Sequence, residues 1–438
     1  MRAGALRLSV VLLAGLIAGC GTARPRGAAG PSGATAAHEG APGGATAGTS
    51  GWHARPEVVA EAAARDPSIN YDEARVPPYV LPDVFGGART PAAWARRRAE
   101  LLALFRTHVY GHAPGRPEGL RFEVLEEDPR AMGGAATLRR VAIVSRQAGR
   151  EHRFGLTLFV PNARRAPVPV FLLLNNRPPG NTDPTRAERS GFWPAEAVVA
   201  RGYGIAALQV GDLAPDDSAH FREGVIRLFE GAPAGPRAPD AWGALAAWAW
   251  GASRTLDYLA TDPRVDAARV AVVGHSRGAK AALWAGAQDE RFALVVANNS
   301  GEGGAALSRR QFGETVARIT TSFPHWFAAG FRSYAGREAA RPTDQHQLLA
   351  LVAPRALYVA SAGDDLWADP RGEFLALAHA SPAYALWDDP PIRPADMPPL
   401  GRPLVAGRRA YHVRRGGHDL TPSNWQQFVD FADVLWQP

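Results

Sequence analysis

Residues 269–287 read RVAVVGHSRGAKAALWAGA, and this stretch decides the fold of the chain. The run RVAVVGH is short and apolar, which is typical of a buried strand, and the alanine-rich run after it predicts a helix. Between the two lies GHSRG, a complete G-x-S-x-G motif. The position of the motif between a strand and a helix favours Ser276 as a nucleophile, and the alternative is a serine in a tight structural turn.

Two glycines make this turn possible. Gly274 and Gly278 let the backbone bend sharply enough to lift the hydroxyl of Ser276 above the sheet. The first turn of the helix that follows offers backbone amides to a developing oxyanion. The stretch therefore predicts a nucleophile together with part of the site that stabilises negative charge.

The rest of the chain indicates the sheet to which this strand belongs. A helical lead-in, with Trp94, Leu101 and Phe105 at helical spacing, comes first. Four strand-like segments follow, at residues 121–127, 137–145, 153–161 and 167–176. Strands and helices then alternate, with strands at 202–210, 269–275, 292–299, 355–362 and 409–416 and helices at 240–260, after Ser276, at 371–380 and at 423–436. Opening antiparallel strands followed by this alternation predict an α/β protein with a mixed, mostly parallel sheet and helices on both faces.

The N-terminus carries an export pattern. Arg2 and Arg7 precede an apolar run at residues 8–18, which is too short to span a bilayer as a stable helix and fits a secretory signal peptide. Because LIAGC resembles the lipobox of bacterial lipoproteins, we expect residues 1–20 to be a lipoprotein-type signal peptide that ends at a lipidated Cys20. Cys20 is the only cysteine, so the chain has no internal disulfide. We expect an exported protein that is lipid-anchored to the bacterial cell envelope, at the outer membrane, with plain secretion as the alternative.

Composition separates a tether from a catalytic domain. Residues 21–52 are Gly, Ala, Ser, Thr and Pro with almost no large apolar side chain, so we expect a disordered tether. The chain as a whole is 46% hydrophobic and 21% charged, as in ordinary globular proteins, and we expect residues 53–438 to form a single catalytic domain. The formal net charge is +7, but the arginines are scattered among acidic residues, which argues against a nucleic-acid partner.

A serine nucleophile needs a histidine that accepts its proton, and with this motif the acid and then the histidine follow the serine along the chain. Of the 12 histidines, only His379, His412 and His418 come after the plausible acids. His379 lies in a helical pattern and His412 in a strand pattern. A base reaches the nucleophile from a loop at the carboxyl ends of the strands, so the sequence favours His418, in the loop RGGHDL. His275 adjoins the nucleophile but is expected to point away from it.

The acid is expected in the turn AGDDLWADP, which ends a strand. Asp364 and Asp365 both lie there, and one of them must accept a hydrogen bond from the imidazole. The spacing through LWA to DP resembles the acid loop of α/β-hydrolases and favours Asp365 over Asp364. Asp369, which precedes a proline, is expected to cap a helix.

Six motifs, in order, carry a resemblance to a known family. GHSRGAK, NNSGEGGAALSRR, GET, FPHWF, DLWADP and GGHDLTPSNW together resemble carbohydrate esterase family 15, the glucuronoyl esterases, from about Tyr71 to the C-terminus. The resemblance implies an α/β-hydrolase fold, a three-layer αβα sandwich. It also implies cleavage, in lignocellulose, of esters that join the carboxylate of 4-O-methyl-glucuronic acid on xylan to alcohols of lignin, with no metal or cofactor.

The resemblance also assigns roles to individual residues. It implies that Arg277 supports the oxyanion and that Lys280, Glu314 and Trp367 hold the glucuronoyl sugar. Lys280 is the only lysine among 49 basic residues and lies one helical turn after the serine, which favours a specific role over that of an exposed helix residue. Glu314 can also be read as a helix-surface carboxylate, and Trp326 in FPHWF as either a substrate contact or a core residue.

The chain departs from the family at one position and leaves two other functions open. Many members carry a glutamate as triad acid where this chain has Asn299, and an amide cannot be the charged partner of an imidazolium, which strengthens Asp365. An acetyl-xylan or general carboxylesterase on the same triad is the alternative enzyme. A surface lipoprotein that only binds glycans is the alternative without catalysis.

Overall fold

The computed structural model describes residues 51–164, 167–232 and 235–436. The expected signal peptide, Cys20 and the expected tether up to residue 50 lie outside these ranges. Trp52, the last residue of the expected tether, is buried, and its backbone N–H donates to the Pro398 carbonyl (3.0 Å). All described residues belong to one compact unit. No helix within the described residues has the length and apolar content to cross a bilayer.

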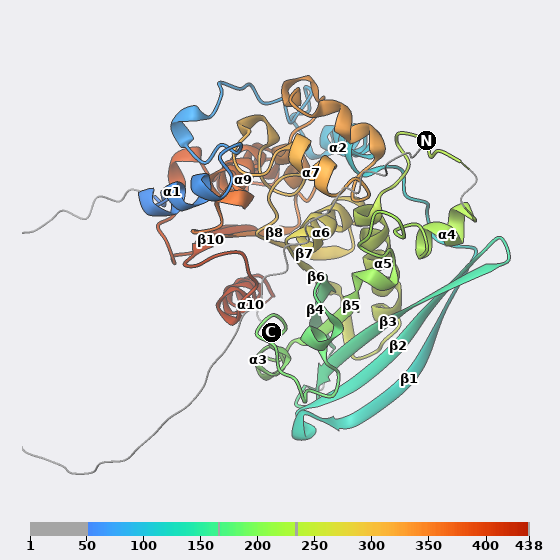
Figure 1. The fold of residues 1–438 in the computed structure, drawn as a ribbon. Coiled ribbons are helices and arrows are strands. Elements are labelled where there is room, and N and C mark those ends of the chain that lie inside the picture. The colour runs from blue at the N-terminus through green and yellow to red at the C-terminus, as the bar shows by residue number, and fades with distance from the viewer. Residues whose placement is uncertain (1–50, 165–166, 233–234, 437–438) are drawn as a thin grey trace, which may run out of the picture. The chain divides into compact units, whose positions relative to one another are not determined.

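A ten-stranded sheet runs through this unit in the order β1-β2-β3-β5-β4-β6-β7-β8-β10-β9 (Figure 1). The six strands from β5 to β10 in this order are parallel to one another, whereas β1, β2, β3 and β9 pair antiparallel. The strands are β1 (Gly119–Ala131), β2 (Ala136–Gln147), β3 (Arg150–Pro161), β4 (Val168–Asn175), β5 (Gly204–Gln209), β6 (Val265–His275), β7 (Phe292–Asn298), β8 (Ala356–Ala362), β9 (Leu404–Ala406) and β10 (Arg409–Arg414). The predicted mixed, mostly parallel sheet is confirmed.

The fourth strand does not belong to the antiparallel opening. β4 pairs parallel with both β5 and β6, and β5 lies between β3 and β4. The physical reason is the burial of β4, because all eight of its residues are buried. A strand covered on both faces belongs in the centre of a parallel sheet rather than in a half-solvated antiparallel one.

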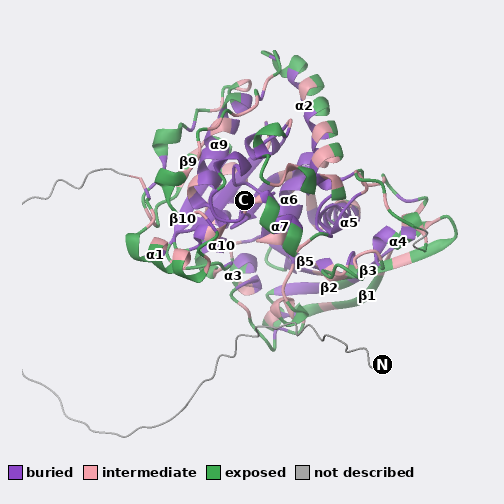
Figure 2. Cartoon of the chain, turned by 45° about the horizontal axis from the view of Figure 1, so that its top comes forward, coloured by how far each residue is buried: buried purple, intermediate pink, exposed green. Residues whose placement is uncertain are grey.

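Helices cover both faces of the sheet and bury two separate sets of alternating strand residues. The larger core packs against α2, α5, α6, α8 and α9, and the smaller core packs against α3 and α10. The helices are α1 (Pro56–Arg65), α2 (Pro91–Phe105), α3 (Ala195–Ala200), α4 (Val225–Glu230), α5 (Ala244–Leu259), α6 (Arg277–Gln288), α7 (Val316–Ser322), α8 (Gln345–Ala350), α9 (Pro370–Ala385) and α10 (Pro422–Trp436). In Figure 2 the outer strand β1 is largely exposed, whereas the strands beside it carry buried residues. The result is the expected three-layer αβα sandwich.

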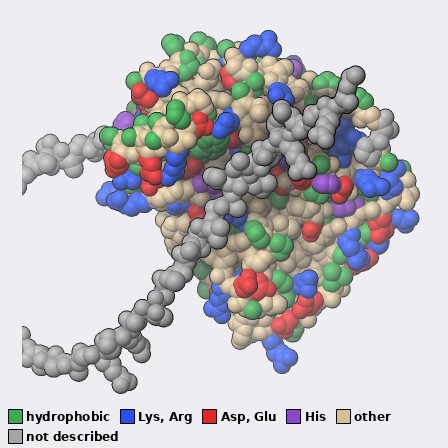
Figure 3. All heavy atoms as spheres, viewed as in Figure 1, with side chains coloured by type: hydrophobic (Ala, Val, Ile, Leu, Met, Phe, Trp, Pro, Cys, Tyr) green, Lys and Arg blue, Asp and Glu red, His purple; other side chains and the backbone are tan. Residues whose placement is uncertain are grey.

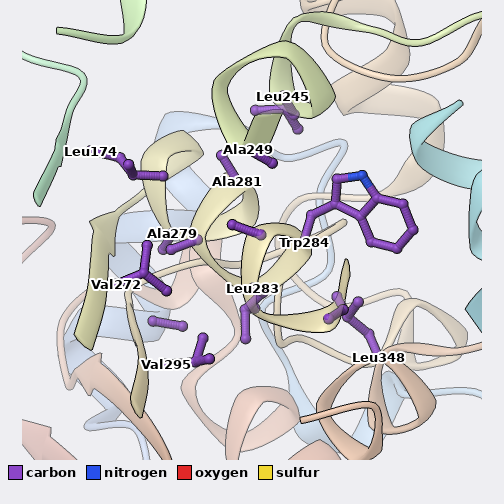
Figure 4. Close-up of a cluster of buried hydrophobic side chains, with 14 of the residues drawn as sticks. Leu174, Leu245, Ala249, Val272, Ala279, Ala281, Leu283, Trp284, Val295 and Leu348 are labelled. Atoms are coloured by element: carbon purple, nitrogen blue, oxygen red, sulfur yellow. The ribbon is translucent and has the colours of Figure 1, made fainter. Parts of the chain in front are cut away.

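Small residues bring α6 close to the sheet, as Figure 4 shows. Ala279 and Leu283 are fully buried and face Val272 of β6 and Val295 of β7 in this cluster. On the far side of the helix the Trp284 ring stacks on Tyr110, with centroids 4.4 Å apart. The first turn of α6, which begins directly after Ser276, is therefore held rigidly over the carboxyl end of β6.

Charged side chains lie at the surface in mixed arrays. Along β1–β3, at the lower right of Figure 3, blue and red side chains alternate. Arg121 pairs there with Glu151 (2.9 Å), and Arg140 pairs with Glu126 (3.3 Å). Exposed pairs of this kind contribute little stability, because water and salt screen them.

Candidate active site

Ser276 lies at the turn between β6 and α6 with φ 56° and ψ −127°, a strained backbone conformation for a residue with a side chain. Its N–H donates to the Asn298 carbonyl (2.9 Å). A Cβ on Gly274 would lie 2.1 Å from the Gly278 carbonyl oxygen, and one on Gly278 would lie 2.9 Å from the Leu174 carbonyl oxygen. Both glycines are therefore required, as the sequence predicts.

His418 and Asp365 meet beside this turn. The His418 Nδ1 and Asp365 Oδ2 atoms are 2.6 Å apart. Asp365 follows β8, and His418 follows β10, so both come from loops at the carboxyl ends of parallel strands. Both side chains and Ser276 line one cavity of about 300 Å³. The bond at Nδ1 leaves His418 Nε2 as the nitrogen that can accept the serine proton.

Asp364 points elsewhere. Its carboxylate pairs with the Arg55 guanidinium at 3.1 Å, and its side chain is 34% exposed, against 6% for Asp365. Two adjacent carboxylates in one turn thus have different partners, and the structure brings Asp365 rather than Asp364 to the imidazole. Asp369 caps α9, as expected, by accepting from the Gly372 N–H (2.9 Å).

Asn299 contacts the acid directly. The Asn299 Nδ2 donates to Asp365 Oδ2 (2.7 Å), the same oxygen that His418 approaches. Asn299 is buried, and its backbone is left-handed with φ 48°. The amide at the family's usual acid position therefore donates a hydrogen bond to the acid and is not itself the acid.

The other histidines near the sheet have structural partners. His275 is buried and accepts from Asn298 Nδ2 (2.8 Å), and burial together with the charge of His418 lowers its pKa well below the usual range. His412, in β10, shares a hydrogen bond with the hydroxyl of Tyr358 in β8 (2.8 Å). Burial and the charge of Arg414 lower the pKa of His412 to about 3. Neither imidazole lines the cavity.

Lys280 lies inside the cavity and not on the helix surface. Its side chain is 5% exposed, its Nζ donates to the Ser300 carbonyl (2.5 Å), and the Glu314 Oε2 is 3.8 Å away. Burial lowers the pKa of the Lys280 ammonium, although the charge of Glu314 opposes this shift. Burial likewise raises the pKa of the Glu314 carboxyl, against the charge of Lys280. The surface readings of these two residues are wrong, since the pair forms a buried charged wall.

Aromatic rings also line the cavity. Trp367 is half-buried and lines the cavity, and so does the buried Trp326. The Trp326 ring stacks face to face on Phe323, with centroids 3.8 Å apart. Trp326 is thus both a core residue and a lining residue, so the two readings of it are compatible.

Sequence reasoning missed two residues of this site. Phe323 lines the cavity, and Asp216 binds the guanidinium of Arg277 through an ion pair. Asp216 lies in the motif-free stretch APDDS, and Phe323 directly precedes the PHWF of a motif noted only for its tryptophan. Asp216 and its partner Arg277 are 61 positions apart in the chain, and local patterns do not encode such a contact.

Arg277, the predicted oxyanion residue, follows the nucleophile and lines the same cavity. Its Nε is buried and has no hydrogen-bond partner within the described part of the chain. The described residues hold no group of three or more His, Cys, Asp or Glu side chains that is close enough to bind a metal ion.

Comparison with known proteins gives consistent relatives. A family model described as "Glucuronyl esterase, fungi" matches residues 237–387. A curated carbohydrate esterase from an unknown prokaryotic organism is 38% identical over 415 residues, which cover 87% of this chain and 94% of that protein. A glucuronoyl esterase structure from Solibacter usitatus has a TM-score of 0.77 at 41% identity and covers 83% of this chain and 100% of that one. The structure of a promiscuous CE15 esterase from a marine bacterial metagenome has a TM-score of 0.76 at 37% identity, covering 84% and 99%.

Proposed function

Because the chain belongs to carbohydrate esterase family 15, the glucuronoyl esterases, and is a carboxylic ester hydrolase, we propose that it cleaves esters of glucuronic acid and of its 4-O-methyl form, as in lignin–xylan linkages. One observation carries this proposal. The cavity that contains Ser276, His418 and Asp365 also contains the buried pair Lys280 and Glu314. A simple esterase does not need a buried charged pair one helical turn from its nucleophile.

The proposed reaction proceeds through an acyl-enzyme. His418 Nε2 takes the proton of Ser276 as the serine oxygen attacks the ester carbonyl carbon. Asp365, bonded to His418 Nδ1, stabilises the imidazolium that forms. The alcohol leaves with the proton that His418 returns, and the glucuronoyl group stays on Ser276. Water then attacks the same carbon, with His418 as base, and glucuronate is released.

In this proposal the sugar is recognised by Lys280, Glu314 and Trp367. The Lys280 ammonium donates hydrogen bonds to sugar hydroxyls, and the Glu314 carboxylate accepts them. Trp367 offers an apolar ring face to the pyranose. Arg277, whose Nε has no partner among the described groups, supports the oxyanion.

Two substrates distinguish this function from a general or acetyl-xylan esterase. Wild-type protein should hydrolyse a methyl glucuronate ester with a higher kcat/KM than 4-nitrophenyl acetate, and Ser276→Ala should abolish both activities. Acetyl esters as the better substrates would favour the alternative enzyme. Glycan binding without turnover, unchanged in Ser276→Ala, would favour a binding lipoprotein.

We also propose that Cys20 carries a lipid anchor and that the protein is exported to the bacterial cell envelope. The support is the lipobox-like LIAGC and the use of the only cysteine at that position. The membrane and a glucuronoxylan or lignin–carbohydrate ester are then the two partners of the protein, one at each end of the tether.

A further inference from the structure

We propose that Asp216 is a positioning residue, which fixes the Arg277 guanidinium so that the Arg277 Nε–H is the side-chain donor to the oxyanion formed at Ser276. The proposal rests on the proposed esterase function. Asp216 lies between β5 and α4, far in sequence from the turn at Ser276.

The contacts of Asp216 converge from three side chains. Asp216 Oδ2 accepts from the Arg277 Nη1, and Oδ1 accepts from Trp326 Nε1 (2.6 Å) and His325 Nε2 (2.9 Å). Trp326 and His325 are buried, and neither can rotate away without losing its place in the core. The Asp216 carboxylate thus links Arg277 to the buried residues 325–326.

The same guanidinium lies over two aromatic rings. The Arg277 Cζ lies 4.8 Å from the ring centroid of Trp326 and 5.5 Å from that of Phe323. A guanidinium is planar, so one hydrogen-bonded nitrogen and two neighbouring rings restrict its movement. Besides Nη1, which binds Asp216, the guanidinium carries Nε, which is buried and has no hydrogen-bond partner among the described residues. A buried donor without a partner costs free energy of folding, so a native structure keeps one where it has a function. Here that function is to donate a hydrogen bond to the negatively charged oxygen of the transition state.

The carboxylate stays ionised over the working range of an esterase. Burial alone would raise the pKa of Asp216, but the hydrogen bond from His325, the charge of Arg277 and the hydrogen bond from Trp326 lower it to about 2. The other charged groups near Arg277 are Lys280, which repels it, and Glu314, which attracts it from the substrate side. Without Asp216, Glu314 would compete for the guanidinium.

The test uses a matched pair of neighbours. Asp216→Asn removes the charge that holds Arg277, and Asp217→Asn changes an exposed carboxylate whose side-chain partner is His220. On a methyl glucuronate ester, we expect Asp216→Asn to lower kcat about 10- to 100-fold, somewhat less than loss of an oxyanion donor itself, with KM within about twofold. Asp217→Asn should match wild type. A kcat for Asp216→Asn within about twofold of wild type would overturn the proposal.

A double-mutant cycle separates positioning from general damage. In the Arg277→Ala background, Asp216→Asn should change kcat by less than about twofold, because the group that it positions is gone. An equal loss in both backgrounds overturns the proposal. Should Asp216→Asn fold poorly, Asp216→Glu takes its place in the cycle under the same criterion. If wild type and Asp217→Asn both fail to turn over any ester, the proposed function fails, which is a different result from a cycle that shows no coupling.

Discussion

At the residue scale, Lys280 shows why one lysine persists in a chain whose other basic residues are arginine. Its ammonium fits between the Ser300 carbonyl at 2.5 Å and the Glu314 carboxylate at 3.8 Å, in a cavity of about 300 Å³. A guanidinium is a wide planar fork on a longer stem and needs more room than a compact ammonium. The site therefore selects the shape of the cation as well as its charge.

Substitution of Lys280 should separate sugar recognition from general catalysis. Lys280→Ala loses a charge-assisted hydrogen bond of about 1.5–3 kcal/mol, which predicts a loss of roughly 10- to 150-fold in kcat/KM on glucuronoyl esters. Lys280→Arg should also lose activity, because the larger group clashes. Small acetyl esters should be hydrolysed almost as before. Equal losses on both substrates would show damage to the turn at Ser276 instead.

The acid can be tested with its own neighbour as control. Asp365→Asn should lower kcat by about 10³–10⁴, because an amide cannot stabilise the His418 imidazolium. The Asn299 Nδ2 would then face a second amide in place of a carboxylate. Asp364→Asn removes only a solvent-exposed pair with Arg55 and should leave kcat near wild type. Near-normal turnover of Asp365→Asn would contradict the assignment of the acid.

The residues of the site differ in how far a local sequence pattern predicts them. Ser276 and His418 follow from a motif and a chain order. The choice between Asp364 and Asp365 depends on which way adjacent side chains point in a turn, and the fold alone decides that. Asp216 meets Arg277 only because loops after β5 and β6 lie together, and no local pattern in the sequence marks such a meeting.

At the element scale, the unit that matters is β6, the turn and α6. Its helix and strand were predictable because a buried apolar run and an alanine-rich run leave few alternatives. The position of β5 between β3 and β4 was not, because strand order is set by crossover connections and not by the strands themselves. Gly286 shows how closely this unit is packed, since a Cβ there would lie 2.2 Å from Val295 Cγ2 of β7.

We expect Gly286→Ala to destabilise the protein although alanine is the better helix former. The gain in helix propensity is about 1 kcal/mol, and overpacking against a stiff β-branched side chain costs about 1–3 kcal/mol. The double variant Gly286→Ala/Val295→Ala should recover part of the loss, because it removes the contacting methyl groups. Gly115→Ala, which meets nothing within 4 Å, is the control. Thermal unfolding checks all three, and a Tm for Gly286→Ala above wild type would refute the packing argument.

At the scale of the whole molecule, buried ionisable groups make stability depend on pH. Glu302 is fully buried, and its Oε1 accepts from the Ser308 hydroxyl (2.6 Å) and the Gly303 N–H (3.0 Å). Burial raises its pKa from 4.5 to about 8, and the charge of Arg341 only partly offsets this shift. The folded state therefore holds a proton on Glu302 that the unfolded chain releases above pH 4.5.

The sign of the effect follows from proton linkage. A raised folded-state pKa contributes stability that is complete below pH 4.5 and is lost as pH rises towards 8. We expect Glu302→Gln, which keeps the acceptor oxygen but cannot ionise, to unfold with a Tm that falls less across this window than that of wild type. Thermal scans at several pH values measure the difference, and parallel Tm profiles for the two proteins would rule the explanation out.

If Cys20 carries the lipid anchor, its substitution should change the location of the protein and leave the esterase activity intact. Cys20→Ser should move the protein from the membrane fraction to the soluble exported fraction, while esterase activity survives because the catalytic residues all lie between residues 276 and 418. Fractionation and activity assays on the same samples check both points. Unchanged membrane association of Cys20→Ser would contradict the anchor.

The solitary buried lysine has a further consequence for chemical labelling. Amine-reactive reagents usually modify many surface lysines at once, and this chain has none besides Lys280. Because burial lowers the pKa of that amine, a larger share of it is uncharged and nucleophilic at mildly alkaline pH than of an ordinary lysine. A small aldehyde or activated ester that enters the cavity will find a single side-chain amine, next to the reacting serine. The same reagents that label most proteins indiscriminately would here report occupancy of one pocket, and a bound sugar would shield the protein from them.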